Sequence, residues 1–272
     1  MIAQELAGKM PLYIPKEGKA QMKIAAAFKV VPDDQDIKVN GDRTLDYSKA
    51  KNTISIYDLN ALEVAAQIAA ENGANAVAIT AGPASIDDSK LKKNVLARGV
   101  EELFMTADDA CANMDARGAA IELAKLVEQA GDIDLVICGD GSADNYAQQT
   151  DVQLACKLGW PIVNAASKVT VKGDTLEVER TLEDAVEVVE VSLPAVVSVT
   201  PDAAEPRIPG MKDILAAGKK PMNVAGAADV TASTITVVDC KAPQQADRKL
   251  EILDASEDGA IEKFAAALKA AL

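Results

Sequence analysis

Residues 134–161, DLVICGDGSADNYAQQTDVQLACKLGWP, decide the fold class of this chain. The apolar run at residues 135–138 predicts a buried strand, residues 139–150 predict a loop, and the amphipathic run that follows predicts a helix ending at Gly159. A loop of small residues between a strand and a helix can bind phosphate, because glycines allow close backbone approach and N–H groups at the helix start point at the anion. Many α/β proteins have such a turn, so the neighbouring segments decide whether this one is functional.

The sequence on the N-terminal side of this stretch alternates apolar strands with amphipathic helices. The strands are expected at residues 23–31, 75–82, 102–106 and 135–138. The helices are expected at residues 58–73, 86–99 and 115–131. Asp58 and Ser85 are expected to cap the first two helices, and Gly73 to end the first one. Continuous apolar strands alternating with such helices predict an α/β fold with a doubly wound parallel sheet, covered by helices on both faces.

Ligands of such sheets bind outside the carboxyl ends of the strands. That rule groups three loops of this chain: the loop after Phe28, the loop after Ala81, and residues 139–150. The grouping makes residues 139–150 a candidate binding loop.

The pattern changes after Pro161. Residues 163–192 are rich in valine, alternate apolar with polar side chains and contain the turn signal Lys172-Gly173-Asp174, which predicts antiparallel hairpins added to the sheet. Residues 193–200 predict a last buried strand, and a proline-rich loop with a short helix at residues 211–217 follows.

Both ends of the chain are expected to lie outside this α/β domain, which is predicted to span residues 23–224. Residues 1–22 are expected to form a loose leader, and residues 225–272 a C-terminal arm. The arm ends in a predicted helix with an apolar stripe of Ile261, Phe264, Ala265 and Leu268. Two interpretations of the stripe stay open: it packs on another chain, or it folds back on its own domain.

Composition excludes several classes of function. The net charge of −14 and the 3% aromatic content argue against nucleic acid or anionic membrane as the main partner. The chain has no histidine, which excludes Ser-His-Asp and Cys-His catalysis and histidine-ligated metal. The cysteines lack CxxC spacing, which argues against zinc and iron–sulfur sites; they are Cys111, Cys138, Cys156 and Cys240. No catalytic residue and no metal site is predicted.

The apolar runs are too short for the roughly 20 residues of a membrane span. The N-terminal segment lacks the apolar core of a secretory signal. We therefore expect no membrane insertion and a cytoplasmic location.

Several ordered segments together resemble one family, the β subunit of electron-transfer flavoproteins. They are AAFKVVPD (26–33), YDLNALEVA (57–65), GDGSADNYAQQT (139–150), GWPIVNAASKV (159–169), ERTLEDAVEVVEVSLPAVVSVT (179–200) and PRIPGMKDILAAGKKP (206–221). The last two are similar to the branch associated with nitrogen fixation and carnitine metabolism. The resemblance covers residues 23–224 and implies an adenine-nucleotide-hydrolase-like version of the parallel sheet.

The resemblance implies a heterodimer with an electron-transfer flavoprotein α subunit that carries an FAD. The β subunit binds the adenosine part of a second FAD in electron-bifurcating members, and AMP in the simple members. In the bifurcating reaction the β-bound FAD takes a hydride from NADH, and the electrons pass to ferredoxin or flavodoxin and to a higher-potential acceptor. An acyl-CoA dehydrogenase-type or quinone-reductase partner is also implied. We expect the bifurcating, FAD-binding type, with the AMP-binding type as the alternative.

The resemblance also implies which residues bind the nucleotide. Matched position by position, they are Ala27, Ser55, Ile56, Tyr57, Asp58, Ala81, Gly139, Asp140, Gly141, Ser142, Ala143, Asp144, Asn145, Tyr146, Ala147, Gln148, Gln149 and Thr150. Family members often carry Asn-Pro where this chain has Ser55-Ile56, which leaves the adenine contacts open. Carboxylates repel a phosphate, so Asp140 and Asp144 are expected to point away, bind ribose hydroxyls or cap the helix.

Residues 206–220 resemble the loop with which the β subunit docks on dehydrogenases. Met211 matches its anchoring apolar side chain, and Lys219 and Lys220 are expected to add positive charge beside it. An ordinary solvated loop is the alternative. By the same resemblance, the arm at residues 225–272 is expected to pack on the α subunit.

A function of another class is a stress-type ATP-binding or signalling protein with the same parallel sheet. Such a protein would lack the docking loop and the long arm, and it would purify without an α subunit. An ATP-pyrophosphatase ligase is set aside, because its phosphate loop follows the first strand, where this chain has Lys29-Val30-Val31-Pro32.

Overall fold

The computed structural model describes residues 21–245 and 250–271. These residues form two compact units. Unit 1 contains the described residues up to Lys38 together with Asp46–Val238, and unit 2 contains Val39–Leu45 and the described residues from Asp239 onward. The predicted leader at residues 1–22 lies outside the described residues except for its last two positions. No helix in the described ranges is long and apolar enough to cross a membrane.

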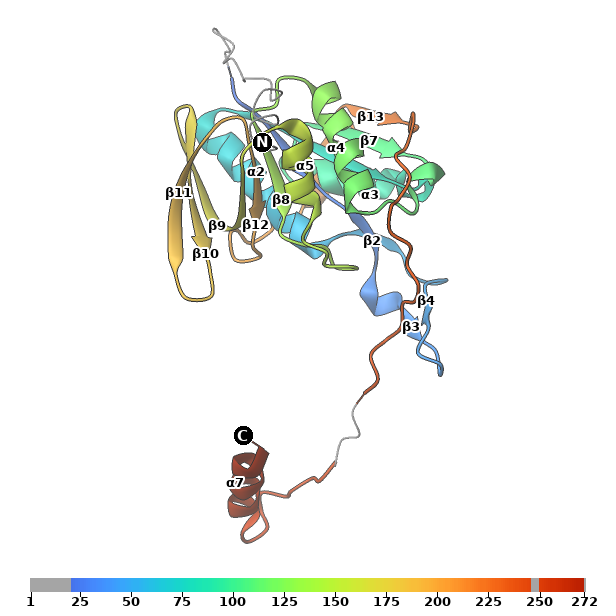
Figure 1. The fold of residues 1–272 in the computed structure, drawn as a ribbon, viewed down its shortest axis with the longest axis vertical. Helices are drawn as coiled ribbons and strands as arrows, with labels where there is room; N and C mark the ends of the chain where they lie inside the picture. Colours follow the sequence, from blue (N-terminus) through green and yellow to red (C-terminus); the bar gives the residue numbers. More distant parts are fainter. Residues whose placement is uncertain (1–20, 246–249, 272) are drawn as a thin grey trace, which may run out of the picture. The chain divides into compact units, whose positions relative to one another are not determined.

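Unit 1 is built on a nine-stranded sheet (Figure 1). Its strands, in spatial order, are β11 (Val186–Ser192), β10 (Thr175–Thr181), β9 (Ile162–Lys172), β12 (Ala195–Val199), β8 (Leu135–Gly139), β1 (Lys23–Ala27), β6 (Asn75–Gly82), β7 (Glu102–Ala107) and β13 (Met222–Ala225). Each neighbouring pair along the series β9, β12, β8, β1, β6, β7 and β13 is parallel. Strands β10 and β11 extend the sheet beyond β9 as antiparallel strands. The predicted fold class is confirmed. The sequence pattern did not indicate β13, which completes one edge of the sheet.

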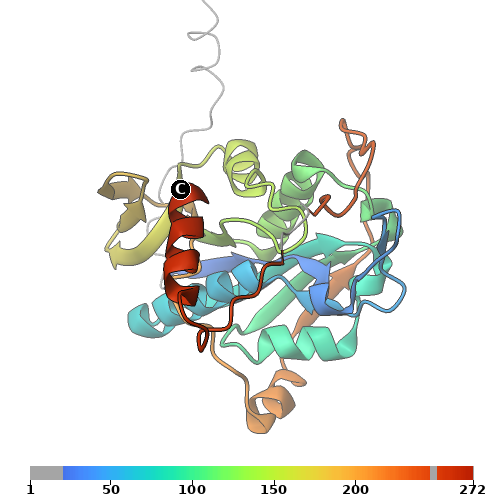
Figure 2. The ribbon, with the colours of Figure 1, turned by 90° about the horizontal axis from the view of Figure 1, so that it is seen from below.

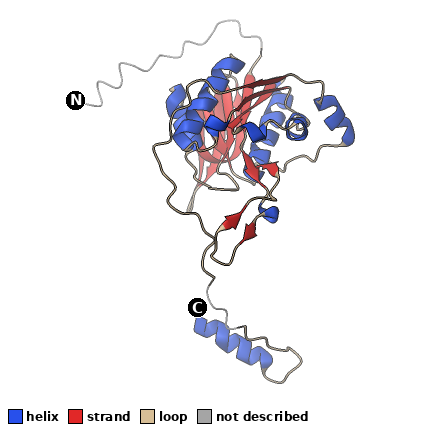
Figure 3. Ribbon diagram, turned by 90° about the vertical axis from the view of Figure 1, so that its right-hand side faces the viewer, coloured by secondary structure: helices blue, strands red, loops and turns tan. Residues whose placement is uncertain are grey.

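Helices cover both faces of this sheet (Figure 3). They are α2 (Ile56–Asn72), α3 (Ser89–Leu96), α4 (Ala116–Ala130) and α5 (Thr150–Leu158). A further short helix, α6 (Met211–Ala217), follows the sheet strand β12 in the sequence. Successive strand residues point to opposite faces, so Ile24 and Ala26 pack in the cluster that contains α2 and α3, while Ala25 packs in the cluster that contains α4 and α5. Burial on both faces explains why the central strands are apolar at nearly every position.

Short elements complete the described part of the fold. They are the 3₁₀ helices η1 (Asp34–Asp36), η2 (Ala84–Ile86) and η3 (Asp109–Cys111), the pair β2 (Val30–Pro32) and β5 (Asn52–Ile54), and the pair β3 (Lys38–Val39) and β4 (Leu45–Asp46). The strand expected at residues 23–31 is therefore two strands, β1 and β2, separated by Phe28 and Lys29.

Two expected helix starts are wrong. Helix α2 begins after Ser55 and not at Asp58, whose side chain is buried and bonds to neighbouring backbone instead. The helix expected at residues 86–99 begins after Asp88, whose carboxylate caps the N–H of Leu91; Ser85 lies in η2. Tertiary contacts decide which of several nearby polar residues becomes the cap, so sequence alone places such boundaries only approximately.

The order of the strands indicates where along the sheet a ligand is expected to bind. After β1 the chain adds β6 and β7 on one side, and then crosses to place β8 on the other side of β1. The winding therefore reverses between β1 and β8, which pair in parallel with Ala26 opposite Ile137. At such a switch point the two loops diverge and leave a crevice at the carboxyl ends of the strands.

Unit 2 contains little regular structure. Thr44 and Lys241 form an isolated antiparallel bridge, and the N–H of Ala242 donates to the carbonyl of Arg43. The unit ends in helix α7 (Ala260–Ala271), the expected terminal helix. Ile261, Phe264 and Leu268 are exposed on it.

Candidate functional site

The carboxyl ends of β1 and β8, the switch point that is called the crevice below, bring most of the predicted site residues together. Ala27 ends β1, residues 55–58 start helix α2, and the loop at residues 140–149 leads from β8 into helix α5. Ala81 lies near the end of β6, the neighbour of β1. Ser55 touches the loop directly, because the backbone N–H of Ala143 donates to its Oγ at 3.3 Å.

Gly139 lets helix α2 approach the end of β8. A Cβ atom at this position would lie 2.7 Å from Oδ1 of Asp58 and 2.9 Å from the carbonyl oxygen of Tyr57. Such distances are closer than carbon and oxygen atoms tolerate, so this position requires glycine. The close approach fixes the first turn of α2 against the crevice.

Asp58 connects both strands of the crevice. Its buried carboxylate accepts a 2.7 Å hydrogen bond from the backbone N–H of Lys29, and it also accepts one from the backbone N–H of Gly139. Burial raises the pKa of Asp58 to about 7, although the hydrogen bonds from Lys29 and Gly139 act in the opposite direction. Asp58 therefore stabilises the structure of the site by bonding to backbone groups, and its buried carboxylate is not exposed to a ligand.

Lys29 neutralises the second acidic side chain of the loop. Its Nζ lies 2.6 Å from Oδ2 of Asp144, and the hydroxyl of Ser142 donates to Oδ1 of the same carboxylate at 2.6 Å. Burial acts to raise the pKa of Asp144, but the hydrogen bonds from Lys29 and Ser142 outweigh it and hold the pKa below its ordinary value. Asp144 is thus paired, and it does not cap helix α5.

Lys29 was not among the site residues predicted from the sequence. It is the second residue after β1, so it lies in one of the loops that the strand-end rule had grouped together. A cation in that position, opposite an acidic loop, was the signal available in the sequence.

Tyr146 folds back over the start of the loop. Its ring would lie 2.3 Å from a Cβ on Gly141, its hydroxyl donates to Oδ2 of Asp140 at 3.2 Å, and its ring centroid is 5.1 Å from that of Tyr57. Tyr146 and Gln148 have φ angles of 45° and 52°. Non-glycine residues rarely adopt this left-handed region, and such strain concentrates at functional sites.

Asp140 keeps one acceptor without a donor. Its Oδ1 is buried and has no hydrogen-bond partner within the residues that the structure describes. Burial raises the pKa of Asp140, and the hydrogen bond from Tyr146 opposes that rise. A buried acceptor of this kind is normally satisfied, so this oxygen suits a ligand that donates a hydroxyl hydrogen.

Two helix starts at this edge lack side-chain caps. Within the described residues, neither Ser55 at the start of α2 nor Gln149 at the start of α5 makes a side-chain capping hydrogen bond. Backbone N–H groups in the first turn of an uncapped helix can bind an anion, which the helix dipole also favours. Residues 143–149 are exposed, so a ligand can reach the start of α5. Together with the neutral donors of Asn145, Gln148 and Gln149, these groups fit a phosphate with an attached sugar.

Residues 206–220 form a separate exposed surface that contains helix α6, which projects from unit 1 (orange, lower edge of Figure 2). The helix has the predicted bounds. Ile208, Met211 and Leu215 are 94%, 78% and 69% exposed. Lys219 is also exposed. These side chains give the surface an apolar centre beside a positive charge.

Lys220 differs from its expected role of presenting charge on that surface. Its Nζ donates to the carbonyl oxygens of Val100 at 2.7 Å and Leu96 at 3.1 Å, and it lies 3.3 Å from Oε1 of Glu101. The ammonium thus joins the segment to the end of helix α3. Its position in sequence beside Lys219 gave no sign of this internal role.

The described part of the chain contains no group of three His, Cys, Asp or Glu side chains that could hold a metal ion. A family model described as "Electron transfer flavoprotein domain" matches residues 43–230. The matched range is more than half of the 272 residues, and it includes the start of α2, the loop at residues 140–149 and the surface around α6.

Proposed function

This chain belongs to the electron transfer flavoprotein family, and we propose that it is the β subunit of a heterodimeric member and binds an adenine nucleotide between β1 and β8. The observation that carries the proposal is the convergence at one switch point of two uncapped helix starts and an exposed loop. Members of this family generally form heterodimers with an α subunit.

The residues present fit the proposed nucleotide. Backbone N–H groups at the start of α5 would hold its phosphate, and the neutral side chains of Gln148 and Gln149 would assist. Oδ1 of Asp140 would accept a hydrogen bond from a ribose hydroxyl, which would satisfy an atom that has no partner among the described residues. Lys29 would keep the carboxylate of Asp144 from repelling the phosphate.

We propose that the nucleotide is the adenosine part of FAD, with AMP as the alternative. When bound, the flavin supplies hydride and single-electron chemistry, so this chain needs to supply binding and orientation only. Helix α2 and the loop at residues 140–149 would orient the adenosine half. In the bifurcating form, electrons from NADH or a dehydrogenase would reach ferredoxin or flavodoxin and a higher-potential acceptor.

We further propose that the surface of Ile208, Met211, Leu215 and Lys219 docks a dehydrogenase or quinone-reductase partner. An apolar centre with a flexible methionine suits adaptable binding. The exposed stripe on α7 would pack on the α subunit. This arrangement assigns the docking of partners and of the α subunit to different segments.

The test is the cofactor content of the heterodimer, purified after co-expression with its α subunit and released by heat for chromatography. The expected result is two FAD for each αβ pair. One FAD with one AMP would select the alternative form, and a heterodimer without any adenine nucleotide in β would refute the proposed site.

A matched pair of variants separates local from general effects of charge. Asp140→Ala is expected to lower retention of the β-site nucleotide by about tenfold, as expected for a lost charge-assisted hydrogen bond. Asp174→Ala, in the exposed turn between β9 and β10, removes the same charge far from the crevice and is expected to retain the nucleotide.

A further inference from the structure

Helix α2 touches two functional regions. Its first turn carries Ser55 and Asp58, which contact the loop and the strand ends of the crevice. Asn60 and Glu63, on the following turns, contact the chain segment that leads to helix α6. Residues three apart lie on the same side of a helix, so one face of α2 serves this second contact.

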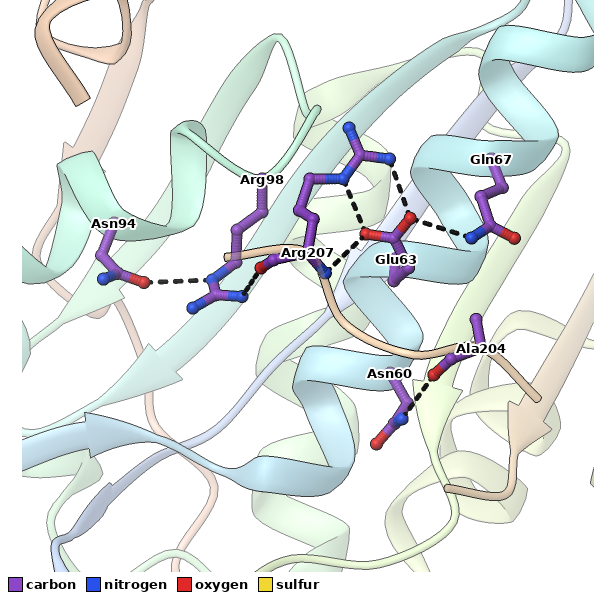
Figure 4. A network of polar contacts seen from close by, with 7 residues as sticks. All are labelled: Asn60, Glu63, Gln67, Asn94, Arg98, Ala204 and Arg207. Carbon is purple, nitrogen blue, oxygen red and sulfur yellow. Dashed lines mark hydrogen bonds and ion pairs between the residues drawn. The ribbon is translucent and has the colours of Figure 1, made fainter. Parts of the chain in front are cut away.

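The segment at residues 201–210 has little apolar burial of its own. Ala204 is its buried side chain within the described residues, whereas Ile208 and Met211, farther along, are exposed. Its position is therefore set mainly by polar contacts. The amide of Asn60 donates to the carbonyl oxygen of Ala204 at 2.7 Å (Figure 4). It also donates to the carbonyl oxygen of Pro201 at 2.8 Å.

Glu63 makes the most extensive of these contacts. Its carboxylate accepts from Nε of Arg207 at 2.6 Å, from NH2 at 2.9 Å and from the backbone N–H of Arg207 at 3.1 Å (Figure 4). Gln67, one turn farther along α2, donates to Oε1 of Glu63 at 2.9 Å. Bidentate hydrogen bonding between a guanidinium and a carboxylate fixes the relative orientation of the two groups as well as their distance.

The turn that follows helix α3 contacts Arg207 from the other side. NH1 of Arg98 donates to the carbonyl oxygen of Arg207 at 2.7 Å, and Nε of Arg98 donates to Asn94 at 3.1 Å (Figure 4). The N–H of Arg207 is thus bonded to helix α2, and its carbonyl is bonded to the turn that follows helix α3. Residue 207 is fixed four positions before Met211.

We propose that Asn60 and Glu63 position the docking surface, so that helix α2 sets the distance between this surface and the nucleotide crevice. The proposal rests on the proposed function, because it assumes that the crevice binds the nucleotide and that the surface around Met211 binds a partner. Ser55 and Glu63 are separated by about 12 Å along the helix at about 1.5 Å per residue. A rigid element of that length would keep a docked partner at a constant distance from the bound cofactor.

Hydrogen exchange of the purified αβ heterodimer, followed by mass spectrometry, tests this role. In Glu63→Gln, residues 201–212 are expected to exchange about tenfold faster, since the segment loses its main polar attachment. Exchange of residues 139–150 and the amount of nucleotide retained in the β site are expected to stay within about twofold of the wild type. Glu71→Gln, on an exposed turn of the same helix, is the matched control and is expected to change none of these.

Arg207→Lys distinguishes orientation from charge, and it does not require a change in the buried carboxylate. Lysine keeps the positive charge but cannot grip both carboxylate oxygens, so this variant is expected to exchange like Glu63→Gln. Wild-type exchange at residues 201–212 in either variant would overturn the proposal. The proposal would also be overturned if hydrogen exchange were accelerated equally in that segment, in all of α2 and in residues 139–150. Such a result would indicate a general structural role. A heterodimer that lacks β-bound nucleotide would refute the proposed site, yet the exchange comparison would remain interpretable.

Discussion

The carboxylate of Asp58 lies 2.7 Å from the backbone nitrogen of Lys29, which follows strand β1. The same carboxylate accepts from Gly139, the last residue of β8. One buried side chain therefore ties the start of helix α2 to both strands at the point where the winding of the sheet reverses. The geometry of the crevice depends on this contact and on the close approach at Gly139.

The state of Asp58 makes the stability of the protein depend on pH. Burial raises its pKa from 3.8 to about 7, so between these values the folded protein keeps a proton that the unfolded chain has lost. The contribution of protonated Asp58 to the free energy of unfolding is complete below about pH 3.8 and disappears as the pH rises through about 7. Its total is on the order of 4 kcal/mol. Asp58→Asn is expected to remove this component from the free energy of unfolding, measured in urea at pH values from 4 to 8. An unchanged pH dependence in the variant would show that Asp58 titrates normally.

Gly139→Ala is expected to destabilise the protein by about 1–3 kcal/mol, because the new methyl group would collide with Asp58 and with the backbone of Tyr57. Affinity for AMP, measured by calorimetry, is expected to fall with it. Gly141→Ala is the control, since its methyl group would meet the ring of exposed Tyr146, which can rotate away. Equal losses of stability in the two variants would contradict this interpretation.

Lys29 and Asp144 are expected to act on nucleotide affinity as a pair. Lys29→Met is expected to weaken AMP binding about two- to fivefold at low salt, because Asp144 would lose its counter-charge and repel the phosphate. Asp144→Asn is expected to strengthen binding by a similar factor, and in its presence Lys29→Met should have a smaller effect. Calorimetric titrations of the four proteins give the coupling energy. Strictly additive effects would mean that the observed contact does not influence the site.

The adjacent side chains of Lys219 and Lys220 are expected to differ in their effects. Lys220→Met leaves the carbonyls of Leu96 and Val100 without a donor, so the free energy of unfolding is expected to fall by about 1–3 kcal/mol. Lys219→Met is expected to leave stability unchanged and to raise the KM for a dehydrogenase partner. Thermal denaturation and steady-state kinetics separate the two outcomes. Loss of stability in Lys219→Met would show that its side chain has an internal role.

Asp115 is expected to hold the chain that follows β13 in a pH-dependent manner. Hydrogen bonds from the backbone N–H groups of Gly118 and Thr234 lower its pKa to about 2. Because the folded pKa is lowered, this contact is complete above the ordinary pKa of 3.8 and is lost as the pH falls through about 2. Asp115→Ala is expected to accelerate hydrogen exchange of residues 232–236 at neutral pH. Asp109→Ala, in the nearby η3 turn, serves as the control. Unchanged exchange at residues 232–236 in Asp115→Ala would contradict the role of this carboxylate.

Part of the candidate site was predictable because it depends on local pattern. A strand, a loop of small residues and a helix were predicted at residues 134–161, and they correspond to β8, the loop at residues 140–149 and α5. Helix α6 also formed at the predicted residues, between Gly210 and Gly218. The role of Lys29 escaped prediction because its partner, Asp144, is 115 positions away in the sequence.

The class of the fold follows from the sequence alone, since the period of the apolar residues specifies which elements are buried on one face and which on two. The candidate loop also follows from the sequence, by the position of its glycines. The tertiary structure decided which strands flank β1, and therefore where the crevice lies. It also decided that Asp58 bonds to strand ends, that Lys220 faces inward, and that Glu63 grips Arg207 across 144 positions. These contacts join residues that become neighbours only when the sheet is assembled, so no periodicity in the chain encodes them.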